Sequence, residues 1–558
     1  MTTVRPATLG LAALFALIVL AQGISAPFQK DAEPQSAEWI QSIVRDGHWL
    51  IPRDSYGYFD RKPPLFYWLS ATVAKLSGGT VDELRARVVS LAAGTALAVC
   101  VLAWTAANVG ALEGWLAFAF LLGTYGFASR ATEALTDMLL TLLIFAAYSL
   151  LFPLFDEPAA RSSRRTVLVG VILGLGILTK GPIALVLWAL SALIYLLLMR
   201  RSPLPLIRER WPWQLMAISI IFGAIWYVPA VIAGKGGVLR IIFAENFGHF
   251  MPGKLGGTGE SQRPFYFIAA RLLGGALPMT LLVPPAILAF ATGELAPEKR
   301  RAVIYQVSMP LAVLIFFTIA SVKRDDYILP ALPGIAILCA SVFTLDGMRG
   351  AAAKLRDIVV AAFVSAPAFA ILFVAFLPDH ASHAKLQSSD AAYYSLFRAE
   401  TWTGPVLGLL VLWLAAVGIE IFALIRRRTI ASGFAFGLAA LSMSLLWTAT
   451  LRPALAEIRS MKNFVPIVAQ FVQGDQLCIP SGINYELSYY YGAAVPDLTD
   501  PRCANPATGK TVYLLATPRE LSAMTADFRA RLKPVAQSNL IGGGGPPALF
   551  KISPGAAK

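Results

Sequence analysis

Residues Thr166–Met199 read TVLVGVILGLGILTKGPIALVLWALSALIYLLLM, and a pair of arginines flanks the stretch at each end. It contains two apolar runs, 166–179 and 182–199, with Lys180 at the break between them. Runs of this kind can cross the hydrocarbon core of a membrane, which is about 30 Å thick. We therefore interpret the stretch as two consecutive transmembrane helices.

Similar apolar runs recur along most of the chain. Of its 558 residues, 57% are hydrophobic and 14% are charged, so a soluble globule could not cover its apolar side chains with polar surface. The sequence predicts an α-helical polytopic membrane protein with about thirteen spans, and we interpret the first run as a retained helix and not as a signal peptide. The other runs lie at 9–25, 85–107, 111–128, 134–153, 213–233, 268–292, 303–320, 327–345, 358–377, 403–425 and 430–449.

Basic residues in alternate turns predict the orientation of the chain. Lys and Arg near span ends resist translocation, so these turns lie in the cytoplasm, and 26–84, 234–267, 321–326, 378–402 and the tail lie outside. The net charge of +14 follows this pattern and not a basic patch on a soluble face, which argues against a nucleic-acid partner. The basic turns hold Arg161, Arg164, Arg165, Arg200, Arg201, Arg208, Arg210, Lys299, Arg300, Arg301, Arg349, Lys354, Arg356, Arg426, Arg427 and Arg428.

The tail, 451–558, is predicted to be a small soluble α/β domain after a membrane domain of residues 1–450. Gln476–Ile479 and Thr511–Leu515 have the composition of short buried strands, and Pro518–Lys533 has helical spacing. Because the outer compartment is oxidising, Cys478 and Cys503 are expected to form a disulfide. A tyrosine cluster fits the core of this domain better than a sugar platform; it consists of Tyr485, Tyr489, Tyr490 and Tyr491.

The first outer segment, 26–84, is long and mixes charged, aromatic and proline residues, which is typical of a functional loop. Its end, Leu65–Leu69, is predicted to begin a helix at the membrane interface after Pro63 and Pro64. Lys62 then stands before a helix N-terminus, where a phosphate is favoured, although a lysine at headgroup level is the alternative.

Further charges at the outer ends of the spans indicate a site for an anionic lipid headgroup beside a base. Structural ion pairing is the alternative for some of them. These residues are Glu133, Asp137, Lys180, Arg263, Arg271, Lys323, Arg324, Asp325 and Asp326, the last followed by Tyr327.

Five motifs occur in one order at matching positions and resemble the bacterial branch of the protein mannosyltransferase superfamily, with the lipid A aminoarabinose transferases as its nearest group. The motifs are Glu33-x-x-x-x-Glu38, Lys62-Pro63-Pro64-Leu65-Phe66-Tyr67-Trp68-Leu69, Thr136-Asp137-Met138, Leu178-Thr179-Lys180-Gly181-Pro182 and Tyr327-Ile328-Leu329-Pro330-Ala331-Leu332-Pro333. The resemblance implies a C-type membrane glycosyltransferase in the bacterial inner membrane. It would move a sugar with inversion from undecaprenyl phosphate to lipid A or another periplasmic acceptor, as a monomer.

The resemblance also implies roles for individual residues. In members of that family, the catalytic carboxylate follows the first span and is the first residue of an Asp-Glu pair. The corresponding pair in this chain reads Ala32-Glu33, so Glu33 and the preceding Asp31 are both candidates. Lys62 matches the lysine that meets the donor phosphate, and Asp137 matches an acidic position near the acceptor or a metal ion. The remaining expected site residues are Arg263, Arg271 and Lys323 for the phosphate, Tyr58, Arg61, Glu133 and Tyr327 for the substrate cavity, and Asp137 with His249 for a divalent ion, the one cofactor considered.

Two other functions are compatible with many spans and outer charges. A lipid-linked glycan transporter or flippase would show internal repeats and charges at the midplane of the bilayer, and we find neither in the sequence. A hydrolase or ligase acting on lipid-linked glycans would share the membrane face and differ in chemistry.

Overall fold

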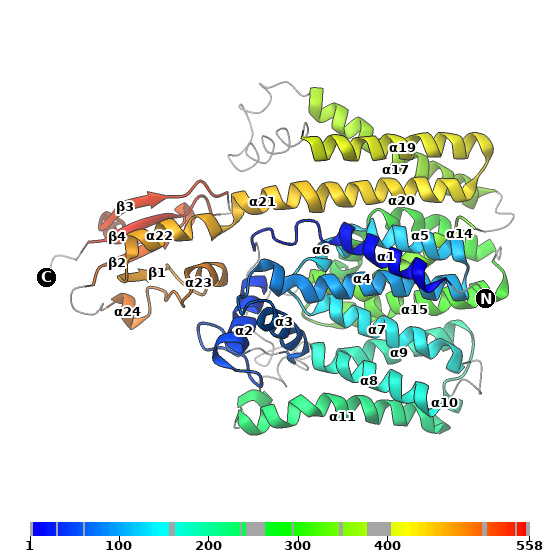
Figure 1. The fold of residues 1–558 in the computed structure, drawn as a ribbon, viewed down its shortest axis with the longest axis horizontal. Coiled ribbons are helices and arrows are strands. Elements are labelled where there is room, and N and C mark those ends of the chain that lie inside the picture. The colour runs from blue at the N-terminus through cyan, green and yellow to red at the C-terminus, as the bar shows by residue number, and fades with distance from the viewer. Residues whose placement is uncertain are drawn as a thin grey trace.

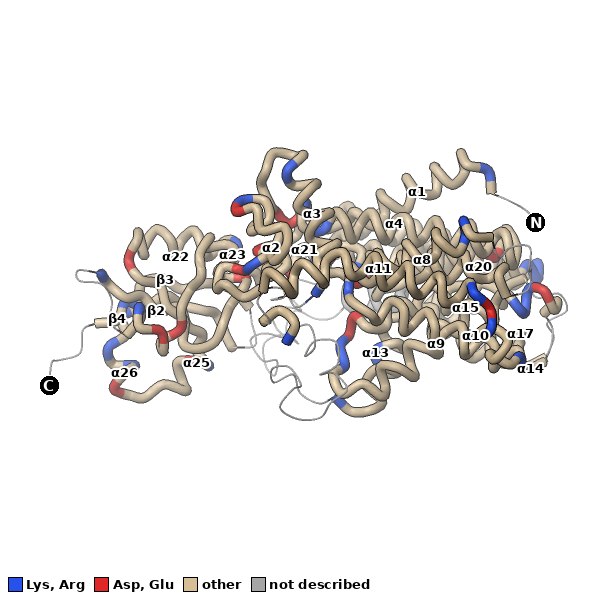
Figure 2. Tube along the Cα trace, turned by 90° about the horizontal axis from the view of Figure 1, so that it is seen from below, with Lys and Arg blue, Asp and Glu red and all other residues tan. Residues whose placement is uncertain are grey.

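The computed structural model describes residues 4–28, 32–59, 62–155, 162–234, 237–240, 263–292, 295–344, 350–376, 403–504, 510–541 and 544–553. Helices form an elongated bundle, and a small sheet domain lies at one end of it (Figure 1). Charged residues gather toward the ends of the bundle and leave long uncharged stretches of helix between them (Figure 2). This distribution is the one expected where lipid surrounds the middle of the helices.

Within the described residues, six helices are long and apolar enough to cross a membrane, and two bent pairs raise the number to eight. The bent pairs are α5 (Ala111–Leu122) with α6 (Tyr125–Ala131), and α13 (Phe267–Gly275) with Met279–Thr292, which includes α14 (Val283–Thr292). The count of about thirteen spans stays a prediction. The six are α4 (Glu83–Asn108), α7 with its 3-10 turn (Asp137–Phe155), α11 (Arg210–Ala233), α15 (Pro297–Ile319), α19 (Gly404–Arg426) and the helix Thr429–Arg459.

The other apolar runs also form helices, and most of these are shorter. The run 327–345 is not one regular helix, because it begins as the 3-10 helix η4 (Asp325–Ala331), which contains Pro330. Proline lacks a backbone N–H, so α16 follows as a separate helix. These helices are α1 (Pro6–Leu20), α8 (Ser163–Lys180), α9 (Ile183–Leu198), α16 (Leu332–Ser341) and α17 (Ala351–Phe376).

Small residues bring neighbouring helices close together. A Cβ added to Gly174 of α8 would lie 2.4 Å from the Cβ of Phe222 in α11, and one added to Gly170 would lie 2.9 Å from Ile218. Without a hydrophobic driving force in lipid, such close backbone approach supplies the van der Waals contact that holds helices together.

The first outer segment forms two helices between α1 and α4, namely α2 (Ala32–Asp46) and α3 (Leu65–Leu76), which pack against each other. The expected helix after Pro63 and Pro64 is therefore present as α3, with Pro64 at its N-cap. Lys62 lies directly before these prolines, so the start of α3 determines its position.

The helix Thr429–Arg459 runs through residue 450 as α20 (Thr429–Leu445), the π-helical turn Leu446–Leu451 and α21 (Arg452–Arg459). The predicted division at residue 450 thus falls inside a continuous helix. After it come α22 (Val465–Val472), β1 (Gln476–Cys478), α23 (Tyr485–Tyr491) and α24 (Pro501–Ala504). The α/β character of the tail and the disulfide between Cys478 and Cys503 are both present.

The sheet has four strands in the order β1-β2-β4-β3, with β1 and β2 parallel and the other pairs antiparallel. The stretch Pro518–Lys533 is not one helix, because Thr517 and Thr525 each cap a separate short helix with their side chains. The remaining elements are β2 (Val512–Ala516), α25 (Pro518–Ser522), α26 (Ala526–Ala530), β3 (Leu532–Gln537) and β4 (Ala548–Ile552).

Candidate active site

Three charged residues from different elements meet at one end of the bundle. Asp137 is the first residue of α7, Lys180 is the last residue of α8, and Asp326 lies in η4. The Lys180 ammonium forms ion pairs with both carboxylates, with Nζ 3.5 Å from Oδ2 of Asp326. Helix dipoles favour this arrangement, because an acid stands at an N-terminus and a base at a C-terminus.

Local backbone features place Lys180 at this point. Gly181 has φ 83°, a left-handed conformation that glycine adopts readily, and it ends α8 directly after the lysine. The Nζ atom of Lys180 lies 5.0 Å from the ring centroid of Tyr327, and the Tyr327 ring stacks on Phe317 with centroids 4.4 Å apart. A cation over an aromatic ring is stabilised by the ring quadrupole.

More cations surround the two aspartates. Arg324 Nε lies 3.4 Å from Oδ1 of Asp326, and the charge of Lys62 acts on both Asp137 and Asp326. Burial by itself would raise the pKa of Asp326, but the charges of Lys180, Arg324 and Arg130 outweigh it and hold that pKa below the usual range. Positive charge from Lys180, Arg324, Arg130 and Lys62 thus surrounds Asp326.

The two carboxylate oxygens of Asp137 differ in their partners. Oδ1 pairs with Lys180, whereas Oδ2 is buried and has no hydrogen-bond partner among the described residues. A buried carboxylate oxygen without a donor is costly, and a donor from a ligand or an ordered water would offset that cost. This geometry suits the predicted role of Asp137 near an acceptor.

Glu33 lies elsewhere on the same end and is held by Arg87 of α4. The guanidinium binds both carboxylate oxygens, with Nε to Oε1 at 2.8 Å and Nη2 to Oε2 at 3.1 Å, and the Ala134 amide also donates to Oε1. Arg87 further donates to the carbonyls of Ile24 and Ala26. Both oxygens of this carboxylate already receive hydrogen bonds, and these contacts suit a positioning role better than that of a base.

The turn between α6 and α7 is fixed from two sides. Glu33 accepts from the Ala134 amide, and Arg452 at the start of α21 binds the Thr132 hydroxyl and donates to the carbonyls of Ser129 and Thr132. Asp137 follows this turn directly. The helix that leads into the sheet domain therefore helps to place Asp137.

The other expected cations lie on neighbouring elements. Arg263 and Arg271 each stand over the ring of Phe267, at 5.3 and 5.1 Å from its centroid, and Arg271 Nε lies 3.2 Å from Oδ1 of Asp325. Lys323 Nζ donates to the Ala320 carbonyl at 2.6 Å. These residues lie in or near α13 and η4, and their contact with a phosphate stays a prediction.

Of the expected cavity residues, Glu133 pairs with Arg130, Tyr327 packs beneath Lys180, and Tyr58 is exposed. Asp31, Arg61 and His249 lie outside the described residues. Among the residues that are described, no group of three His, Cys, Asp or Glu could hold a metal ion. The divalent-ion site of Asp137 with His249 thus stays a prediction.

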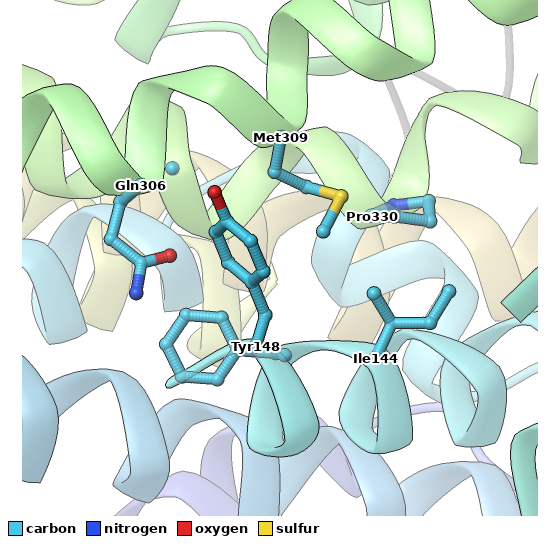
Figure 3. A pocket seen from close by; sticks show the side chains of 7 residues that line it. Ile144, Tyr148, Gln306, Met309 and Pro330 are labelled. Carbon is cyan, nitrogen blue, oxygen red and sulfur yellow. The ribbon is translucent and has the colours of Figure 1, made fainter. Parts of the chain in front are cut away.

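The bundle interior beside α7 is closed. A gap lined by Ile144, Tyr148, Gln306, Met309 and Pro330 has no room for the centre of a water molecule (Figure 3). Tyr148 and Tyr305 stack there with centroids 4.0 Å apart, and each hydroxyl donates to the other residue's carbonyl. This gap is a packing feature and not a substrate site.

Sequence reasoning did not identify Arg87, Arg130 or Arg452 as parts of this region. Arg87 was the most detectable of them, because it lies inside a predicted span and a charge at that depth requires a partner. Which carboxylate would be its partner could not be read from the sequence.

Comparison with known proteins finds similar sequences. Residues 61–227 match the family described as dolichyl-phosphate-mannose-protein mannosyltransferase. Two relatives are named undecaprenyl phosphate-alpha-4-amino-4-deoxy-L-arabinose arabinosyl transferase. The relative from Shewanella sediminis is 25% identical, and the match covers 62% of this chain and 61% of that protein. The relative from Serratia proteamaculans is 23% identical, and the match covers 86% of this chain and 83% of that protein.

The fold is also found among solved structures. ArnT from Cupriavidus metallidurans bound to undecaprenyl phosphate matches over 100% of both chains, with a TM-score of 0.72 and 18% identity. The apo state of that protein matches with a TM-score of 0.67 over 98% of this chain and 97% of its own, also at 18% identity. In sequence and in fold, this chain resembles the protein mannosyltransferase superfamily of C-type membrane glycosyltransferases.

Proposed function

We propose that this protein is an inverting glycosyltransferase of the bacterial inner membrane. It moves a sugar from undecaprenyl phosphate to lipid A or another acceptor on the periplasmic side. The observation that carries the proposal is the cluster in which Lys180 joins Asp137 and Asp326 within reach of the charge of Lys62. The names of the relatives support the donor class, and the fold shared with a protein bound to undecaprenyl phosphate supports the same class.

The reaction needs a leaving group to be stabilised. The bond between sugar C1 and the phosphate oxygen breaks, its electron pair stays on undecaprenyl phosphate, and an acceptor oxygen forms the new bond to C1. Lys62 and an arginine, Arg263 or Arg271, stabilise the charge that grows on the phosphate. Each such interaction at a preorganised site typically contributes about 2.7 to 4 kcal/mol.

The acceptor needs a carboxylate on the other side of C1. We assign this role to Asp137, whose buried Oδ2 has no hydrogen-bond partner among the described residues, or to Asp31, and we assign a positioning role to Glu33. A hydroxyl acceptor loses a proton to the carboxylate as the bond forms. A phosphate acceptor is already ionised, so the carboxylate then only orients it.

A transporter is less well supported. Its substrate path would require polar groups through the middle of the bundle, whereas the charges lie toward the ends (Figure 2) and the gap beside α7 admits no water.

The test is transfer by the purified protein in detergent or vesicles. We expect lipid A incubated with undecaprenyl phosphate-linked 4-amino-4-deoxy-L-arabinose, or with a related donor, to gain the mass of one glycosyl unit. Lys62→Ala should lower kcat/KM about 10²-fold to 10³-fold, because the phosphate loses a cation. The matched control is Lys75→Ala near the end of α3, since Lys75 stands over the ring of Trp49 instead.

Two outcomes would contradict the proposal. Full activity of Lys62→Ala would remove the lysine from the phosphate site. Release of free sugar without any transfer would instead indicate a hydrolase.

A further inference from the structure

One helix of the sheet domain contacts three carboxylates of the first outer segment. The Ser488 hydroxyl donates to Glu38 Oε1 at 2.6 Å, and the Tyr485 hydroxyl donates to Asp54 Oδ2 at 3.1 Å. The third contact leads from the Tyr490 hydroxyl to Glu83 Oε1 at 2.9 Å. All three donors belong to α23.

Additional contacts fasten both ends of the segment to the same helix and its surroundings. The Tyr490 hydroxyl accepts from the Phe28 amide at 3.0 Å, and the Tyr489 hydroxyl donates to the Val81 carbonyl at 2.8 Å. From the segment, the Tyr56 hydroxyl donates to the Val495 carbonyl at 3.1 Å. The segment is thus bound near its start, in its middle and near its end.

Helix α23 is itself fixed on its domain. Oε1 of Glu486 accepts from the Ser460 hydroxyl at 2.6 Å and from the Met461 amide at 2.7 Å, just after α21 ends. Leu487 is buried in the core of the sheet domain. The helix therefore provides a rigid surface for the outer segment.

The first outer segment, which α23 contacts, carries residues of the proposed site. Helix α2 is held on one side by the ion pair of Glu33 with Arg87 and on another by the bond of Glu38 with Ser488. It packs against α3, whose start places Lys62. A shift of α2 relative to the bundle would therefore displace the phosphate-binding lysine.

These contacts have features that simple domain adhesion does not need. Glu38, Asp54 and Glu83 are all buried, and burying a carboxylate is unfavourable unless its oxygens receive hydrogen bonds. Apolar side chains would hold two surfaces together without this requirement, whereas hydrogen-bonded carboxylates define one geometry.

We propose that α23 is a positioning element of the active site. It holds α2 and α3 so that Lys62 meets the donor phosphate, and the soluble domain is thereby required for turnover. This inference rests on the proposed function, and Ser488, Tyr485 and Tyr490 are its positioning residues.

The experiment removes the three hydroxyls from the full-length protein as Ser488→Ala, Tyr485→Phe and Tyr490→Phe, combined in one variant. Hydrogen–deuterium exchange of the amides in 32–46 and 65–76 reports how often α2 and α3 open locally, and so how firmly they are held. The kcat of sugar transfer reports whether the active site still works. We expect exchange there to rise about tenfold and kcat to fall about tenfold, while the sheet strands keep their protection.

Two matched variants separate positioning from general loss of structure. Tyr491→Phe removes a hydroxyl from the same helix, but that ring packs on the core of the sheet domain and should behave like wild type in both measurements. The single variants Ser488→Ala and Ser488→Thr form the second comparison. Ser488→Ala should lower kcat, whereas Ser488→Thr keeps the hydroxyl and should have a kcat near that of the wild type.

Unchanged exchange in 32–46 would overturn the proposal, and so would raised exchange with wild-type kcat. A wild-type protein that transfers no sugar would contradict the proposed function instead. In that case the exchange measurement still decides whether α23 holds α2.

Discussion

Arg87 and Glu33 form a bidentate ion pair between α4 and α2, although 54 positions separate them in the chain. Both side chains are almost fully buried, with 1% and 2% of their surfaces exposed. Two parallel hydrogen bonds fix the relative orientation of the two helices as well as their distance.

Removing only the arginine should be strongly destabilising. Arg87→Met leaves Glu33 buried without its cation, and we expect a loss of about 3 to 5 kcal/mol of unfolding free energy. The double variant Arg87→Met with Glu33→Leu should recover part of this loss, because no charge then stays unpaired. Chemical denaturation in detergent measures both variants. A double variant as unstable as the single one would contradict this account.

Lys180 should be essential for transfer, because it separates two buried carboxylates. In Lys180→Met, Asp137 and Asp326 face each other without the cation between them, and we expect kcat/KM to fall at least about 10²-fold. The control is Lys299→Met, since Lys299 pairs with Glu113 beyond the far end of α4. Equal losses in the two variants would indicate a general structural effect.

The contact between the outer segment and the sheet domain should weaken as pH rises. Burial raises the pKa of Glu38 and that of Asp54 above their ordinary values. The hydrogen bonds that the two carboxylates receive lower these pKa values, but the effect of burial is larger. The folded state thus binds these protons more tightly than the unfolded state does. Stability from the two groups is fully present below their ordinary pKa values and falls as pH rises through the raised ones.

Hydrogen–deuterium exchange in 32–46 between pH 4 and pH 7, corrected for intrinsic exchange rates, checks this pH dependence. Glu38→Gln combined with Asp54→Asn should flatten it, since neither amide titrates. A wild-type profile that shows rising protection with pH would contradict the direction.

Reduction of the disulfide should loosen the sheet domain alone. Cys478 and Cys503 are 25 positions apart, and closing a loop of that size contributes about 3 kcal/mol to the folded state. Cys478→Ala with Cys503→Ala should therefore lower the unfolding temperature of the domain. Cys100→Ala serves as the control, because Cys100 is a free thiol in α4.

Local patterns predicted much of the architecture. The apolar runs correspond to helices, the strands at Gln476 and Val512 lie where hydrophobic composition placed them, and Lys180 lies beside Asp137 as span ends suggested. Each of these features depends on neighbours in sequence or on the membrane boundary. The bend of 68° between α5 and α6 escaped prediction, because continuous hydrophobicity does not show where a helix changes direction.

Contacts between distant segments could not be predicted in the same way. The tyrosines of α23 were interpreted as domain core, yet three of them bond to residues of the first outer segment. Nothing in the spacing of Tyr485 or Tyr490 distinguishes a core tyrosine from one whose hydroxyl meets a distant carboxylate. Arg87 and Glu33 likewise needed the packing of α2 on α4 to become a pair.

The bond of Glu38 with Ser488 joins residues that are 450 positions apart. Glu38 leaves the ribosome early, whereas Ser488 is made only after all the predicted membrane spans. During biogenesis, the outer segment must therefore wait for the last domain to be synthesised and folded before this contact can form. The order of synthesis itself delays assembly of this end of the molecule until nearly the whole chain is in place.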